Sequence, residues 1–186
     1  VVFSEEVDWN PVPQSNPQWH FDQIMDSLKR AAAHLPRVDA IGGSSAGVIV
    51  RNHVKLATLF RGVPPDEFNR RVKGLFLEIK AAWGGIPFEI VNDGEVTALA
   101  GSMSLGDNAV LGVALGSSQA AGYVTPEGNI TPWLNELAFA PVDYQPGAPA
   151  DEWSKDVGCG VQYFSQQAVG RLAPKAGLVF PKDLPL

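Results

Sequence analysis

The sequence has few features of membrane proteins, disulfide-bonded proteins or secreted proteins. It contains one cysteine, Cys159, among 186 residues, and one cysteine cannot form a disulfide within the chain. No apolar run approaches the roughly 20 residues that a transmembrane helix needs. The N-terminus also lacks the basic and apolar segments of a signal peptide. We therefore expect a cytoplasmic protein with no membrane partner.

Basic residues are scarce and scattered. The chain has 14 Lys and Arg against 20 Asp and Glu, which gives a net charge of −6. Nucleic-acid binding relies on clustered Lys and Arg that neutralise phosphates, so no nucleic-acid partner is expected. Hydrophobic residues make up 45% and charged residues 18% of the chain, a composition typical of a folded domain with a buried core.

The order of apolar patterns and helix breakers predicts an α/β protein. A helix is predicted to begin at Asn16-Pro17, with Asn as the cap and Pro in the first helical position, and to end by Pro36. A second helix should run from Pro64 to Gly84, with an apolar stripe of Phe68, Val72, Leu75, Phe76 and Ile79 on its buried side. A short helix should reach about Leu99, and a last one should cover 161–172. Strands are predicted at 1–6, 38–41, 86–91 and 108–115, the last of them buried, followed by a hairpin turn at 125–129.

The segment 86–101 carries the strongest functional signal. The apolar run from Ile86 to Val91 brings Asn92 and Asp93 to the start of a helix. Open α/β sheets bind their ligands beyond the carboxyl ends of their strands, which favours a site here. Asp is also a common helix N-cap, because its oxygens accept the unpaired N–H groups of the first turn. Taken alone, capping is the simpler explanation.

Two segments rich in small residues also follow predicted strands, at 42–47 and 116–122. Glycine lets backbone N–H groups approach a phosphate with no Cβ in the way, although such loops are more often only tight turns. No Gly-Lys-Ser/Thr follows either segment, and the glycine spacing differs from the dinucleotide fingerprint. A P-loop and a Rossmann site are therefore excluded.

Taken together, the order and spacing of these segments resemble the ROK family (repressors, unassigned reading frames and sugar kinases). Asn92–Glu95, Gly116–Gly122 and Asn135–Phe139 are similar to the family's Asn-Asp-Ala-Asn, Gly-Thr-Gly-Ile-Gly-Gly-Gly and Gly-Glu-Ile-Gly-His. The segment 41–47 is similar to the family's Ile-Gly-x-x-x-Pro-Gly turn, and the segment 158–165 is similar to its Gly-Cys-Leu-Glu-x-Tyr-x-Ser motif. The resemblance covers about residues 1–172.

The resemblance implies an α/β fold of the two-lobed actin-like, hexokinase-like (ribonuclease H-like) type, present here in part. Residues 1–91 would form part of the N-terminal lobe. Residues 92–186 would start the C-terminal lobe and carry the sugar-site segments.

The resemblance further implies a sugar kinase, a phosphotransferase that moves the γ-phosphate of ATP to a hydroxyl of a hexose or amino sugar. Asp93 would be the general base that accepts the hydroxyl proton, and Asn92 and Glu136 would hold neighbouring hydroxyls. ATP and Mg²⁺ are the implied cofactors, and the implied phosphate-binding residues are Gly116, Ser117 and Ser118.

Three departures from the family stand out. The family's nucleotide-binding Asp-x-Gly-Gly-Thr hairpin and its C-terminal Gly-Gly segment have no counterpart. The chain is therefore either a fragment of a longer protein, which we favour, or a protein that has lost the nucleotide site. Phe139 replaces the family's zinc-binding His, and Cys159 alone remains of its Cys cluster. One cysteine cannot make a tetrahedral site, so we expect no zinc and a buried, structural Cys159. Val161 stands where a sugar-contacting Glu is typical.

Two other functions stay open. One is a non-catalytic sugar or sugar-phosphate sensor of the same fold, favoured by the Gly116-Ser-Ser sequence and the missing nucleotide motifs. The other is an unrelated α/β domain in which Asp93 is only a helix cap. The sequence does not name the sugar, the phosphoryl donor or the oligomer, although exposed edge strands would favour a homodimer.

Overall fold

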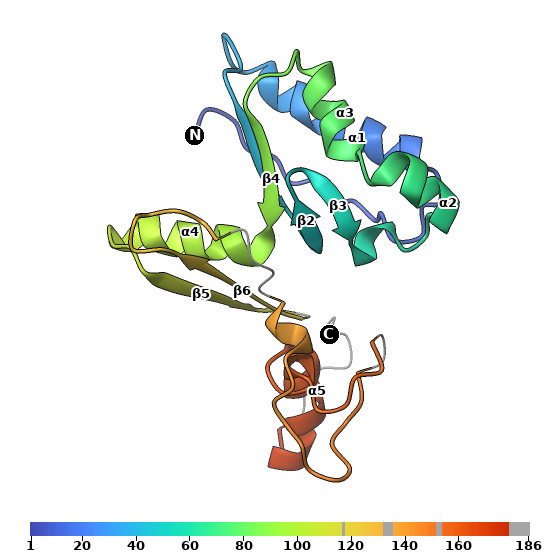
Figure 1. The fold of residues 1–186 in the computed structure, drawn as a ribbon, viewed down its shortest axis with the longest axis vertical. Coiled ribbons are helices and arrows are strands. Elements are labelled where there is room, and N and C mark those ends of the chain that lie inside the picture. The colour runs from blue at the N-terminus through green and yellow to red at the C-terminus, as the bar shows by residue number, and fades with distance from the viewer. Residues whose placement is uncertain (117, 132–135, 152–153, 179–186) are drawn as a thin grey trace. The chain divides into compact units, whose positions relative to one another are not determined.

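The computed structural model describes residues 1–116, 118–131, 136–151 and 154–178. The chain forms two compact units, Val1–Asn92 and Asp93–Leu186. In Figure 1 the first unit runs from blue to green, and the second runs from green to red. In the part of the chain that the structure describes, no helix is both long enough and apolar enough to cross a membrane.

Helix α1 (Pro17–Ala32) begins where the sequence predicts. The side chain of Asn16 accepts a hydrogen bond from the backbone N–H of Gln18 at 3.0 Å, and Pro17 fits the first turn because its missing N–H would have no helical partner there. The predicted strand at 1–6 is wrong. These residues have no regular structure and pair with none of the described strands. Val1 and Val2 are exposed.

The first unit has a parallel pair of strands, β1 (Ile41–Ser45) and β4 (Phe88–Asn92). The pairing runs from Ile41 opposite Phe88 to Ser45 opposite Asn92, so both strands end side by side. The predicted loop at 42–47 is therefore wrong for its first four residues, which belong to β1. At Gly43 the missing side chain serves packing, since a Cβ there would lie 2.8 Å from the Cδ1 of Ile90.

A β-hairpin that the sequence analysis missed follows β1. Strands β2 (Val48–Val50) and β3 (His53–Leu56) are joined by a two-residue turn, Arg51-Asn52, in which both φ angles are positive, as type I′ hairpin turns require. The buried Asn52 side chain accepts a hydrogen bond from the N–H of Ile90 at 2.7 Å. It also donates one to the carbonyl of Phe88 at 3.1 Å. Asn52 thus fastens the hairpin to β4.

The predicted helix after Pro64 consists of three pieces. They are α2 (Pro65–Glu67), a π-helical turn (Phe68–Val72) and α3 (Leu75–Ala82). The predicted apolar stripe is confirmed for Val72, Leu75, Phe76 and Ile79, which are buried, whereas Phe68 is half-buried. They join a core completed by residues of α1, the sheet and the adjoining 3₁₀ turn (Thr58–Phe60). The helix ends before Gly84 and Gly85, which both have a φ of 72°.

His20 lies within this core with no solvent exposure. Its Nε2 lies 3.3 Å from the carbonyl oxygen of Gln14, and the rings of Trp19 and Phe60 contact it edge-on, with centroid distances of 5.2 and 4.9 Å. Burial lowers the pKa of the imidazole below its ordinary value of 6.5, because the charged form loses its hydration.

Acidification is therefore expected to destabilise the protein through His20. An unfolded chain takes up a proton at the ordinary pKa of 6.5, whereas the buried imidazole stays neutral to lower pH. The contribution of His20 to stability is complete above pH 6.5 and is lost as the pH falls through the lowered pKa of the folded state. Urea unfolding at a series of pH values should show this loss. The His20→Phe variant should show a shallower pH dependence, and an unchanged slope would contradict the assignment.

The second unit begins with a helix packed on a hairpin. Helix α4 (Asp93–Leu105) continues beyond the predicted end at Leu99. It lies along the antiparallel strands β5 (Val110–Leu115) and β6 (Gln119–Val124), as Figure 1 shows. The predicted loop at 116–122 is wrong from Gln119 onward, because those residues belong to β6. The turn at 125–129 is confirmed by a hydrogen bond of 2.8 Å from the N–H of Thr125 to the carbonyl of Asn129.

Glycines set the distance between α4 and this hairpin. A Cβ on Gly122 would lie 2.4 Å from the carbonyl oxygen of Gly94 and 2.5 Å from the Cα of Glu95. A Cβ on Gly112 would lie 2.5 Å from the Cα of Ala98. Helix backbone thus rests directly on strand backbone. The prediction that β5 is buried throughout is wrong, because the helix covers one face only and Leu111, Val113 and Leu115 are exposed on the other.

The remainder of the second unit is built from short turns and one helix. The turns at Leu137–Phe139 and Gly160–Gln162 are 3₁₀, and helix α5 (Gln166–Leu172) is followed by another 3₁₀ turn (Pro174–Ala176). The last helix begins later than predicted, because the hydroxyl of Ser165 caps it by accepting the N–H of Ala168 at 3.2 Å. A small core contains Ala138, Cys159 and Val161.

Candidate functional site

The predicted pair Asn92 and Asp93 lies where β4 passes into α4. Asn92 is the last residue of the strand and is only 8% exposed. Its Nδ2 donates a hydrogen bond to the carbonyl of Gly47 at 2.8 Å. Asp93 is the first residue of the helix and is exposed. A buried amide is thus followed directly by a solvent-accessible carboxylate at the carboxyl end of a parallel strand.

Asp93 makes local contacts with the start of its own helix. One carboxylate oxygen accepts a hydrogen bond from the N–H of Gly94 at 3.2 Å. The Asp93 carbonyl accepts one from the hydroxyl of Thr97 at 2.9 Å. A negative charge at this position is stabilised by the helix dipole. The same charge is accessible to a substrate, so the geometry suits both a helix-terminal role and a general base.

Glu136 lies on a separate segment of the second unit. It is half-buried and directly precedes the 3₁₀ turn Leu137–Phe139. Its carbonyl accepts the N–H of Phe139 at 3.2 Å, and Ala138 in the same turn is buried in the core beside Cys159. The backbone that carries Glu136 is therefore anchored on its C-terminal side.

The backbone of Gly116, a predicted phosphate-binding residue, is engaged within the fold. Its N–H donates to the carbonyl of Ser118 at 2.9 Å, and its own carbonyl accepts the N–H of Gln166 at 2.8 Å. Ser118 is exposed. Ser117, with Asn135 of the neighbouring motif, lies outside the described residues. Phosphate binding by this loop stays a prediction, and among its described residues the exposed hydroxyl of Ser118 is the most accessible group.

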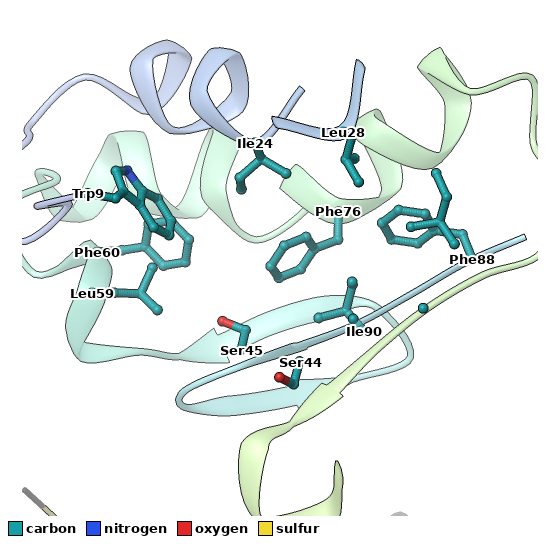
Figure 2. A pocket seen from close by; sticks show the side chains of 13 residues that line it. Trp9, Ile24, Leu28, Ser44, Ser45, Leu59, Phe60, Phe76, Phe88 and Ile90 are labelled. Atoms are coloured by element: carbon teal, nitrogen blue, oxygen red, sulfur yellow. The ribbon is translucent and has the colours of Figure 1, made fainter. Parts of the chain in front are cut away.

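An apolar cavity of about 210 Å³ lies in the first unit. Figure 2 shows the side chains of Ile24, Leu28, Phe76, Phe88 and Ile90 around it. Ser44 and Ser45 supply the polar side chains of its lining, which is completed by Trp9, Ile41, Gly42, Gly43, Leu59 and Phe60. Because no charged side chain lines this cavity, it offers little to a sugar or a phosphate. The sequence analysis did not identify it.

Cys159 is a buried free thiol, as predicted. Burial raises the pKa of the thiol, because the thiolate would lose its hydration. Among the described residues, no group of three or more His, Cys, Asp or Glu side chains is arranged to hold a metal ion. Phe139 packs against the same small core.

The fold matches that of solved ROK-family proteins. A ROK-family transcriptional regulator, a homolog of the E. coli MLC protein, matches with a TM-score of 0.65 and 19% identity over 90% of this chain and 42% of its own. The ROK hexokinase from Thermus thermophilus matches with a TM-score of 0.66 and 19% identity, over 90% of this chain and 54% of its own. A ROK glucokinase from Streptomyces griseus, solved with glucose and AMPPNP, matches with a TM-score of 0.56 and 20% identity. The match covers 83% of this chain and 49% of the glucokinase chain.

These matches confirm the predicted resemblance and the fold class. The chain has the α/β fold of part of a ROK protein, of the actin-like sugar kinase type, and it spans about half the length of the solved structures. No protein-family model matches the sequence, and no curated protein matches it. Since the solved matches include both kinases and a transcriptional regulator, the activity has to be argued from the residues.

Proposed function

We propose that this chain forms the sugar-binding part of a ROK-type sugar kinase, which phosphorylates a hexose or amino sugar. The observation that carries the proposal is the placement of Asn92 and Asp93 at the carboxyl end of β4, with the amide buried and the carboxylate exposed. The fold of the ROK hexokinase and glucokinase supports it. In this proposal the two units correspond to parts of the two lobes.

The proposed role of Asp93 follows from the chemistry of the acceptor. A sugar hydroxyl is a weak nucleophile until a carboxylate accepts its proton. The exposed carboxylate of Asp93 is accessible for this step, whereas Asn92 is buried and Glu136 is half-buried. Asn92 and Glu136 are proposed to bind neighbouring hydroxyls and so to orient the reacting one.

ATP with Mg²⁺ is the proposed phosphoryl donor, in keeping with the AMPPNP in the matched glucokinase structure. When bound, it would supply the phosphoryl group and the cation that offsets its charge. The described part of the proposed phosphate loop fits a nucleotide poorly, because both backbone polar groups of Gly116 are used within the fold.

A second candidate function is a sugar-binding regulator without phosphoryl transfer. The engaged backbone of Gly116 favours it, as does the match to a ROK-family transcriptional regulator. In this alternative Asn92, Asp93 and Glu136 would bind the sugar, and Asp93 would act as a hydrogen-bond acceptor only.

Calorimetric titration of the full-length protein with a panel of hexoses and hexosamines, and separately with ATP–Mg²⁺, distinguishes these functions. Binding of both a sugar and ATP–Mg²⁺, with release of ADP on mixing, is the result expected for the kinase. Binding of a sugar alone would identify the regulator. Binding of neither would contradict both and would leave Asp93 as a helix-terminal residue.

A further inference from the structure

Gly47 lies in the two-residue connection between β1 and β2, and its carbonyl contacts the end of β4. Its carbonyl oxygen accepts the hydrogen bond from Nδ2 of Asn92 at 2.8 Å, and Ser45, two residues earlier, is the register partner of Asn92. The two ends of an amide side chain differ, since the nitrogen only donates and the oxygen only accepts. A carbonyl at this position therefore fixes which end of Asn92 points toward β1.

The position of that carbonyl is itself tightly held. Gly47 has a φ of +102°, in the region that side chains rarely adopt. A Cβ there would lie 2.4 Å from the carbonyl oxygen of Leu56 and 2.6 Å from the Cβ of Ala57. Leu56 ends β3, and the turn before β3 is fastened to β4 through Asn52. The backbone of Gly47 thus rests on a hairpin that is bonded to the strand carrying Asn92.

We propose that Gly47 is a positioning residue for the sugar site and that its carbonyl holds the Asn92 side chain in its binding orientation before the sugar arrives. The inference rests on the proposed function in one respect, that Asn92 contacts the sugar. Because the protein already holds the Asn92 amide in one orientation, sugar binding does not have to order this side chain. The entropy cost of ordering it is therefore absent from the binding free energy.

A double-mutant cycle on sugar affinity tests the proposal. Calorimetry would give the Kd of the sugar for the wild type, Gly47→Ala, Asn92→Ala and the double variant. If Gly47 acts through Asn92, Gly47→Ala should weaken binding about tenfold when Asn92 is present and less than about twofold when it is replaced. If Gly47→Ala weakened sugar binding equally with and without Asn92, the proposal would be overturned. Equal effects would mean that the substitution damages the site independently of Asn92.

The matched control is Gly74→Ala. Gly74 is a glycine of the same unit whose added Cβ would have no atom within 4 Å, and it lies between the π-helical turn and α3. This variant should bind the sugar as the wild type does.

A second measurement covers the case in which Gly47→Ala fails to fold. In an NMR spectrum of the ¹⁵N-labelled wild type without sugar, the Asn92 side-chain NH₂, assigned by its loss in Asn92→Ala, should show at least one proton protected from exchange. This pattern should persist when sugar is added. Two rapidly exchanging protons in the free protein would overturn the proposal. The NMR result does not depend on sugar binding, whereas a wild type that binds no sugar contradicts the proposed function alone.

Discussion

The Asp93→Asn variant is expected to lose turnover by about 10²- to 10⁴-fold while its sugar affinity changes only a few-fold. The magnitude is that of removing a general base, since asparagine keeps the shape of the side chain but cannot accept the hydroxyl proton. The exposed position of Asp93 at the start of α4 makes a large loss of stability unexpected. Steady-state assays of sugar phosphorylation, with calorimetric sugar binding on the same preparations, would measure both effects.

Asp66→Asn is the matched control for this substitution. Asp66 is also an exposed carboxylate in the first turn of a helix, α2, and its charge should contribute only about 0.3–1 kcal/mol through the helix dipole. Turnover of this variant should equal that of the wild type. If the two variants behaved alike, with a small stability loss and no difference in turnover, Asp93 would be a helix-terminal residue and not a base.

Gly122→Ala is expected to lower the stability of the second unit strongly. The new Cβ would lie 2.4 Å from the carbonyl oxygen of Gly94 and 2.5 Å from the Cα of Glu95. Both are backbone atoms, which cannot rotate away as the end of a flexible side chain can. Separating α4 from the hairpin should cost about 1–3 kcal/mol, the usual range for overpacking, and more for a larger residue. Urea unfolding would measure the loss.

Gly101→Ala is the control for that substitution and should act in the opposite direction. Gly101 lies in α4, and its added Cβ would be 3.6 Å from Cγ1 of Val110, an ordinary van der Waals distance. Alanine is favoured over glycine within a helix by about 0.5–1 kcal/mol. Destabilisation of equal size by both variants would show that the close backbone approach at Gly122 is not the cause.

The sequence predicts the helices and the central strands better than the segments of small residues. The Asn16-Pro17 start and the apolar stripe ending at Ile79 depend on local rules of capping and periodicity, and both are confirmed. Gly43 and Gly122 were assigned to loops because glycine is rare in strands. Their role depends on contacts with Ile90 and with the start of α4, and no local rule reveals these contacts.

Part of the candidate site could likewise be predicted from local order. An apolar run followed by Asn92 and Asp93 indicates the end of a strand, and the structure places both residues there. The hydrogen bond between Gly47 and Asn92 joins residues far apart in the chain, so spacing gave no sign of it. The hairpin around Asn52 left only a weak signal, because the β-branched run Val48–Val50 is followed two residues later by His53–Leu56, in which only Val54 is β-branched.

The exposed row on β5 has a practical consequence for anyone producing this protein. Leu111, Val113 and Leu115 point away from α4, and the strand Val110–Leu115 carries no charge or proline. Uncharged, apolar strands with an exposed face pair readily with copies of themselves. We therefore expect the protein to aggregate at high concentration through this strand, and Val113→Lys should reduce the aggregation.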